Sequence, residues 1–79
     1  MYSAVVLINV ERKQVKKVAE ELSQLTGVKE IYSVAGEYDL VLTLSTESKP
    51  EFAELVTDKI VHNELVHHTK TLFAMDQYK

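Results

Sequence analysis

The sequence contains no cysteine, which excludes both a disulfide bond and a cysteine-based metal site. Its 79 residues are enough for one small domain spanning residues 1–79. A chain of this size buries only about 60–65% of the surface that its unfolded form exposes, so a single copy gains limited stability from its core. Without a disulfide, oligomerisation is one of the few remaining ways to stabilise the fold.

Positive charge and long apolar runs are also scarce. Nine Lys and Arg residues against twelve Asp and Glu residues give a formal net charge of −3, and the basic residues are spread along the chain. Direct nucleic-acid binding requires a concentrated positive surface, so this composition disfavours it. The apolar run from Ala4 to Ile8 is too short for a signal or membrane segment. We therefore expect a soluble cytoplasmic protein without a nucleic-acid or membrane partner.

The first third of the chain changes from strand to helix periodicity. Residues 2–10 are β-prone, and both of their alternating sets are mostly apolar, a pattern typical of a strand that is buried on both faces. Residues 11–26 carry an apolar stripe at helical spacing, formed by Val15, Val18, Ala19, Leu22 and Leu25. Gly27 is placed to close this helix.

The remaining residues predict two strands, a helix and a last strand. Residues 28–35 and 38–45 have strand character and meet at Gly36, which can adopt the positive φ of a tight connection. Ser48-Lys49-Pro50-Glu51 has the pattern of a capping box and predicts the start of a second helix. Residues 65–78 then return to alternation and predict the last strand.

The predicted element order is therefore βαββαβ. It favours an α+β, ferredoxin-like sandwich, in which a four-stranded antiparallel sheet carries both helices on one face because its crossovers are right-handed. The first and third strands, however, carry apolar residues on both faces. In so short a chain only another subunit can cover the second face, so we expect a sheet-to-sheet homodimer of the dimeric α/β-barrel type.

The connection at Gly36 also presents polar groups, in the order Gly36-Glu37-Tyr38-Asp39. A bound amino acid is a zwitterion, and its site needs N–H donors for the carboxylate and an acceptor for the ammonium group. Gly36 permits close approach of the backbone, and Asp39 supplies the acceptor. Alternatively, Gly36 only forms the turn and Asp39 bonds to nearby backbone. For Tyr38, packing in the core is favoured over a role as a pocket wall.

The segment Val28-Lys29-Glu30-Ile31-Tyr32-Ser33-Val34-Ala35-Gly36-Glu37-Tyr38-Asp39-Leu40-Val41-Leu42 resembles the ligand-binding domain of the Lrp/AsnC family of amino-acid-responsive regulators, also called the RAM domain. Thr69-Lys70-Thr71-Leu72-Phe73-Ala74-Met75 resembles the Thr-rich last strand of that family. The similarity extends over essentially the whole chain. Because the first strand begins at residue 2, the chain resembles the stand-alone version of the domain, without the helix-turn-helix DNA-binding domain. Ala35 stands where the family commonly has Thr, which removes a hydroxyl beside the expected pocket.

The resemblance implies a function in binding and assembly. Family dimers form through their sheets and assemble further into rings, commonly octamers or decamers, with small effectors such as amino acids bound at the junction between dimers. Full-length Lrp/AsnC regulators would be partners through mixed assembly. The ligand residues that the resemblance implies come from the turn and from the last strand of the same or a neighbouring subunit: Gly36, Glu37, Tyr38, Asp39, Leu72, Phe73 and Ala74.

Three other functions fit parts of the pattern. A purely structural oligomerisation module would assemble and bind no ligand. Small enzymes of the dimeric α/β-barrel type share the element order, but the sequence offers no nucleophile–base pair and no Gly-rich phosphate loop, so we expect no enzyme and no cofactor. The ACT domain usually has its ligand glycine after the first strand, where this chain has Asn9-Val10-Glu11. Adjacent His67 and His68 would point to opposite faces of a strand, which disfavours a metal site.

Overall fold

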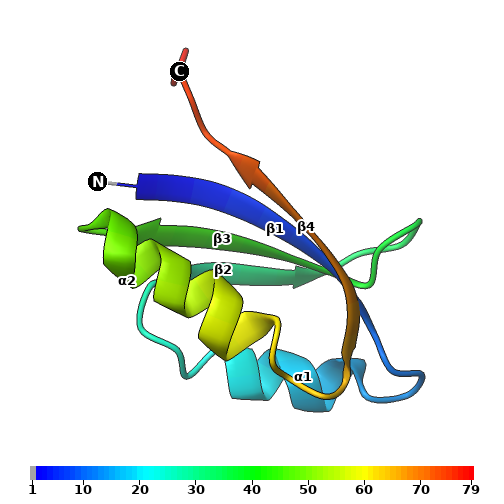
Figure 1. Ribbon diagram of the computed structural model, residues 1–79. Helices are drawn as coiled ribbons and strands as arrows, with labels where there is room; N and C mark the ends of the chain where they lie inside the picture. The colour runs from blue at the N-terminus through cyan, green and yellow to red at the C-terminus, as the bar shows by residue number, and fades with distance from the viewer. Residues whose placement is uncertain (1) are drawn as a thin grey trace.

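Strands and helices follow one another along the chain in the βαββαβ order that the periodicity predicts (Figure 1). A computed structural model describes residues 2–79. The elements are β1 (Tyr2–Val10), α1 (Val15–Leu22), β2 (Val28–Ser33), β3 (Leu40–Thr46), α2 (Lys49–Glu54), the π-helical segment η1 (Leu55–Ile60) and β4 (Val66–Phe73). Within residues 2–79, no helix is both long and apolar enough to cross a membrane.

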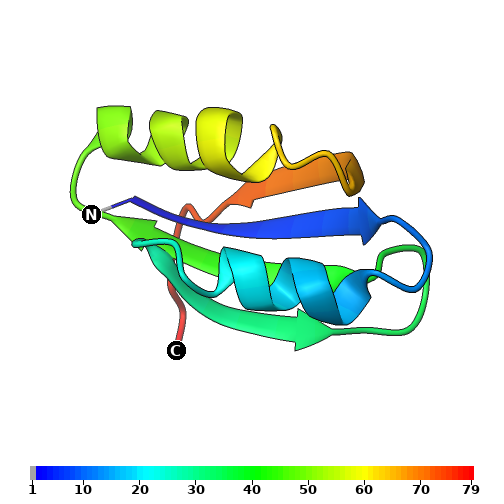
Figure 2. The same cartoon turned by 90° about the horizontal axis from the view of Figure 1, so that it is seen from below.

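The four strands form one antiparallel sheet in the order β2-β3-β1-β4. The central strand β1 pairs with β3 on one side and with β4 on the other. α1 and the continuous α2–η1 segment lie on the same face of the sheet (Figure 2). The predicted α+β, ferredoxin-like sandwich is confirmed.

The core lies between the sheet and the helices. Every second residue of β1 and β3 is buried there, because successive side chains of a strand point to opposite faces. The helical segments supply the opposing apolar side chains. The buried apolar residues are Ala4, Val6, Ile8, Val10, Val18, Leu22, Leu40, Leu42, Leu44, Phe52, Leu55 and Ile60.

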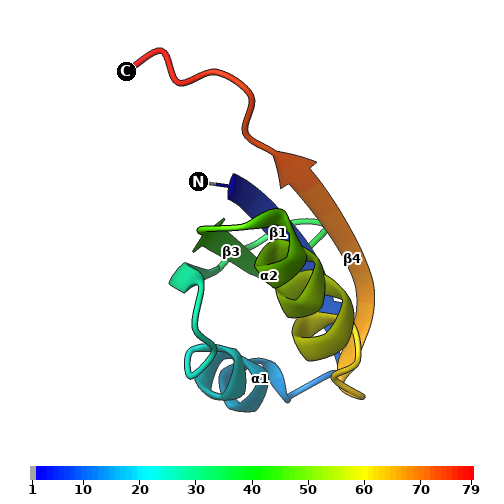
Figure 3. The ribbon, with the colours of Figure 1, turned by 60° about the vertical axis from the view of Figure 1, so that its left-hand side comes forward.

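The other face of the sheet carries no helix within the described residues; we call it the open face (Figure 3). The strand alternation and the pairing register assign to it Ser3, Val5, Leu7, Asn9, Glu30, Tyr32, Val41, Thr43, Ser45, His68, Lys70 and Leu72. Apolar side chains at its centre, such as Leu7 and Val41, are half-buried. The doubly apolar pattern of β1 predicts cover on both faces, and within residues 2–79 one copy of the chain covers only one of them.

The first helix is shorter than the predicted range of residues 11–26, because its N-terminal part is not helical. Lys13 adopts a φ of 67°, a left-handed value that an α-helix cannot contain, and α1 begins only at Val15. The helix ends at Leu22 with Ser23 as its C-cap. Gly27 therefore does not close the helix as predicted; it forms the later turn before β2, where it is buried and has a φ of 101°.

The connection between β2 and β3 is longer than the predicted tight turn at Gly36. β2 ends at Ser33 and β3 begins at Leu40, so the connection comprises residues 34–39. The backbone N–H of Val34 donates to the carbonyl of Asp39 at 3.0 Å across its base. Gly36 has the positive φ that was predicted, 135°.

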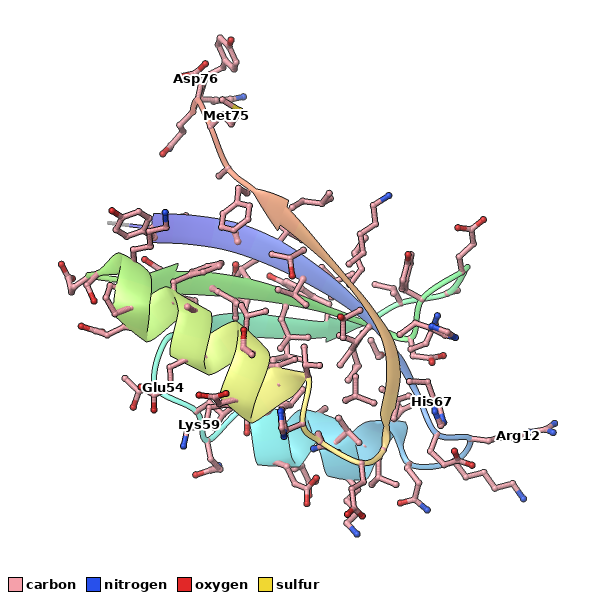
Figure 4. All side chains as sticks on the ribbon, in the orientation of Figure 1. Arg12, Glu54, Lys59, His67, Met75 and Asp76 are labelled. Carbon is pink, nitrogen blue, oxygen red and sulfur yellow. The ribbon has the colours of Figure 1, made fainter. Side chains whose placement is uncertain are left out.

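The last strand ends earlier than the predicted range of residues 65–78. The N–H of Ala74 donates to the carbonyl of Ser3 at 3.0 Å, and β1 begins immediately before Ser3, so no strand remains for later residues to pair with. Residues after 74 lead away from the sheet (Figure 3). Met75 and Asp76 consequently lie apart from the rest of the molecule (Figure 4).

The second helix begins as the capping-box pattern predicts. The Ser48 hydroxyl accepts a hydrogen bond from the N–H of Glu51 at 3.3 Å and donates to the Glu51 carboxylate at 3.2 Å. The helix then widens into η1, which the periodicity did not indicate. The wider π-helical turn allows Leu55 and Ile60, five residues apart, both to be buried against the sheet.

Candidate functional site

The connection of residues 34–39, which contains the predicted ligand loop Gly36–Asp39, projects from the end of the sheet where β2 meets β3 (Figure 1). Gly36 and Glu37 are exposed. A Cβ added at Gly36 would meet no atom within 4 Å, so the outer side of this loop is open space. The loop therefore presents its backbone to solvent or to a neighbouring molecule.

Asp39 is held against the end of β1 by two hydrogen bonds. Its backbone N–H donates to the carbonyl of Ile8 at 2.9 Å. Its carboxylate oxygen Oδ2 accepts the N–H of Val10 at 2.8 Å, in a half-buried position. The side chain thus satisfies a backbone donor that lies beyond the end of the β1–β3 ladder. This is the backbone-bonding role that the sequence analysis left open beside ligand binding.

Tyr38 is not part of the core, contrary to the favoured expectation. It is half-buried in the connection before β3 and is absent from the buried apolar cluster. The reason is the length of the connection: β3 starts at Leu40, so the alternation that would point Tyr38 toward the core does not extend back to it.

The predicted last-strand residues lie at the opposite end of the sheet from the loop. Leu72 pairs with Val5, and the N–H of Ala74 bonds to Ser3, whereas Asp39 bonds to Ile8. Ser3 and Ile8 are five residues apart on one strand, about 17 Å at the usual strand rise. One protomer therefore does not bring the two groups of predicted ligand residues together.

Leu72 and Phe73 also point to opposite faces of the sheet. Leu72 lies on the open face and is 46% exposed. The Phe73 ring lies on the helix face, where its centroid is 5.1 Å from that of Phe52 in a tilted arrangement. Phe73 therefore stabilises the contact between β4 and α2.

The surface also contains two hollows that the sequence analysis missed. The larger, of about 690 Å³, lies among the turn before β2, the end of β3 and the α2–η1 segment. It is lined by charges of both signs, and Glu54 and Lys59 are two of them (Figure 4). The smaller, of about 570 Å³, lies between α1 and the β2 side of the sheet. None of the seven predicted ligand residues lines either hollow, and no motif links the separate segments that do.

The open face carries a small polar cluster at its β2 edge. The Glu30 carboxylate accepts the hydroxyl of Tyr32 at 2.7 Å and that of Thr43 at 3.1 Å. The hydrogen bond from Tyr32 and the negative charge of Glu30 raise the pKa of Tyr32 above its ordinary value of 10.0. The cluster joins β2 to β3 across the open face.

Elsewhere, titratable groups pair without forming a metal site. The His67 ring nitrogen Nε2 lies 2.5 Å from a carboxylate oxygen of Glu11, and both side chains are about half exposed. Within residues 2–79, no three His, Asp or Glu side chains converge as metal ligands would.

Residues 3–79 match the family model of the Lrp/AsnC ligand binding domain. The chain belongs to this family. An uncharacterised HTH-type transcriptional regulator of Pyrococcus abyssi is 33% identical over 64 residues, which cover 81% of this chain and 43% of the relative. The chain thus spans less than half the length of this regulator.

Solved structures share the fold of this chain. TTHA0845 from Thermus thermophilus is 37% identical, with a TM-score of 0.92 and coverage of 100% of this chain and 99% of that chain. AsnC of E. coli has a TM-score of 0.91 at 19% identity and supports the fold, with 99% of this chain matching 53% of that chain. The regulator NMB0573 of Neisseria meningitidis, solved as a complex with L-Met, has a TM-score of 0.87 at 18% identity, with coverage of 99% and 52%.

Proposed function

We propose that residues 1–79 form a single effector-binding and oligomerisation domain that takes part in transcription regulation and acts in the cytoplasm. The observation that carries this proposal is the match of residues 3–79 to a family defined by ligand binding. The ligand that we propose is an amino acid or a similar small zwitterion. The L-Met complex of NMB0573, which shares this fold, supports that chemical class.

The proposed ligand site combines the loop of one protomer with β4 of another. Asp39 would accept the ligand's ammonium group through its oxygen Oδ1, while Oδ2 stays bonded to Val10. Backbone groups at Gly36, with Glu37 and Tyr38, would surround the carboxylate. Because the C-terminal end of β4 in the same protomer lies at the far end of the sheet from the loop, Leu72, Phe73 and Ala74 would come from a neighbouring subunit. This separation supports a site at the junction between dimers.

Assembly is the second half of the proposal. The half-buried apolar centre of the open face supports a homodimer through the sheets. We propose that such dimers assemble into rings, octamers or decamers, and that mixed assembly with full-length Lrp/AsnC regulators transmits the effector signal. With a net charge of −3, the domain would influence DNA through such partners and would not contact it directly.

Calorimetric titration of the protein with the twenty amino acids and related metabolites tests the sensing role. At least one of them is expected to bind, and the absence of binding across the panel at millimolar ligand would contradict the role.

The variant Asp39→Asn separates the two tasks of Asp39, because an amide oxygen can still accept the Val10 N–H but no longer carries the charge that attracts an ammonium group. It should bind the ligand at least about tenfold more weakly, a loss of roughly 1.4 kcal/mol, while its melting temperature changes little.

The matched control is Asp76→Asn, the same change of charge in the exposed segment after β4. Asp76→Asn should bind as the unmodified protein does. Unchanged affinity in Asp39→Asn would contradict the placement of the site at the loop.

A structural assembly module is the second candidate function, and one observation favours it. The Asp39 carboxylate already has a structural partner in Val10, so its presence does not require a ligand. In that case light scattering would show the assembly, and the titrations would show no binding. A monodisperse monomer would contradict both functions.

A further inference from the structure

Two charged side chains of opposite sign stand at opposite edges of the open face. Among the paired residues of the four strands, Glu30 on β2 and Lys70 on β4 are the Asp, Glu, Lys or Arg side chains that point to this face. We propose that Lys70 of one protomer pairs with the Glu30–Tyr32 cluster of a second copy, and that this pairing fixes how two open faces meet. The inference rests on the proposed sheet-to-sheet dimer and adds its orientation.

The pairing register places these residues in two adjacent rows across the sheet. One row runs Tyr32, Val41, Leu7, Lys70, and the next runs Glu30, Thr43, Val5, Leu72. The rows are two residues apart, about 7 Å along the strands. The middle of both rows is mainly apolar, and the charges lie only at the ends. This is the distribution of an interface with a dry centre and a polar rim.

A two-fold axis parallel to the strands brings the opposite charges together. It lays β4 of one copy over β2 of the other and keeps each row over itself, so Lys70 faces Tyr32 of the partner, one row from Glu30. The packed sheets would be about 10 Å apart, a gap that side chains fill from both sides. Glu30 is already held by the Tyr32 and Thr43 hydroxyls, so it is ordered before a partner arrives.

A two-fold axis across the strands would have the opposite effect. It lays β2 over β2 and β4 over β4, which brings Glu30 toward Glu30 and Lys70 toward Lys70 at the two edges. Like charges brought together at an interface are costly, and among residues 2–79 neither Glu30 nor Lys70 forms an ion pair that would offset this cost. The ion pair that this part of the chain does contain joins His67 to Glu11, and it involves neither Glu30 nor Lys70. The charges therefore select the first axis.

Complementary charge reversal tests this pairing. In a homodimer of Glu30→Lys, each contact between position 70 of one protomer and position 30 of the other would bring two lysines together. In a homodimer of Lys70→Glu, the same contact would bring two glutamates together. Each variant alone should dimerise at least about tenfold more weakly than the unmodified chain. Mixed in equal amounts, the two variants should form a one-to-one heterodimer, because each contact across that interface joins a lysine of the first variant to a glutamate of the second. Native mass spectrometry distinguishes the heterodimer from both homodimers by mass.

The controls are Lys17→Glu and Glu20→Lys, the same reversals on exposed positions of α1, away from the open face. Singly or mixed, they should assemble as the unmodified chain does. Single reversals at Glu30 and Lys70 that leave assembly unchanged, or a mixture that shows no heterodimer preference, would overturn the pairing while the proposed dimer stands. An unmodified chain that stays monomeric would instead overturn the proposed dimer and the pairing with it.

Discussion

Gly27 and Gly36 both adopt positive φ, yet their surroundings differ. A Cβ at Gly27 would lie 2.8 Å from Cδ2 of Leu55 and 3.2 Å from Cγ2 of Thr46, two buried residues. A Cβ at Gly36 would meet nothing within 4 Å. The polar residues that follow Gly36 make it the glycine that the sequence links to function. The contacts around Gly27, however, leave less room for a side chain than those around Gly36.

Alanine substitutions at these two glycines should therefore differ in cost. Gly36→Ala should lower the free energy of unfolding by about 1–2 kcal/mol, the usual cost of a left-handed conformation for an L residue. Gly27→Ala should cost about 1–3 kcal/mol more, because the core must also accommodate an extra methyl group. Urea denaturation of both variants measures the difference. Equal losses would show that the contacts of Gly27 relax freely.

Tyr32 offers a pH-dependent test of the cluster on the open face. Its hydrogen bond to Glu30 raises its pKa, so the folded protein holds the Tyr32 proton more tightly than the unfolded chain does. The resulting stability is fully present below the unfolded pKa, near 10, and is lost as the pH rises through the folded value. Glu30→Gln removes the negative charge and should lower the pKa of Tyr32.

The change can be followed by the ultraviolet absorbance of tyrosinate, with Tyr32→Phe identifying which of the four tyrosines is titrating. Glu64→Gln, an exposed carboxylate in the connection before β4, is the control and should leave the Tyr32 pKa in place. A Tyr32 pKa that is the same in Glu30→Gln and in the unmodified protein would show that the hydrogen bond is not formed in solution.

At the scale of the elements, periodicity predicted which segments are strands and helices. The βαββαβ order follows because period-2 and period-3.6 patterns are distinct over eight or more residues. The ends of the elements were less predictable. The left-handed φ of Lys13 shortens α1, and the bonds of Asp39 to β1 lengthen the β2–β3 connection. Both depend on contacts between residues that are distant in sequence or on a backbone conformation that lysine seldom adopts.

The candidate site was predictable only as a set of residues. The Gly36–Asp39 loop was found because glycine, an aromatic residue and a carboxylate lie together in the chain. The separation of this loop from Leu72–Ala74 depends on the register of β1 with β3 and β4, which the sequence does not specify without the fold. The larger hollow was missed for a similar reason, since residues from separate segments of the chain line it.

At the scale of the whole molecule, the open face is the apolar surface that one copy of the chain leaves without a covering layer. Helices cover one side of the sheet, while Val5, Leu7 and Val41 on the other side are only half-buried by their neighbours in the sheet. If a second copy covers them, then folding and association are linked, and stability depends on protein concentration. A monomeric fold would show no such dependence.

The melting temperature should therefore rise with protein concentration. Each tenfold increase adds about 1.4 kcal/mol to the stability of a dimer, or about 3–5 °C for two chains of this size. Val41→Asp puts a charge at the centre of the open face, where burial against a partner would leave it unpaired. It should make the protein monomeric by light scattering, lower its melting temperature and remove the concentration dependence.

Val61→Asp supplies the matched control, because Val61 is 44% exposed at the end of η1 and lies away from the open face. The same substitution there should change the melting temperature little and leave its concentration dependence intact. If Val41→Asp instead keeps the mass and the concentration dependence of the unmodified protein, the open face is not the dimer interface. Val5, Leu7 and Val41 would then face solvent, and the stability of the fold would come from the core of a single copy of the chain.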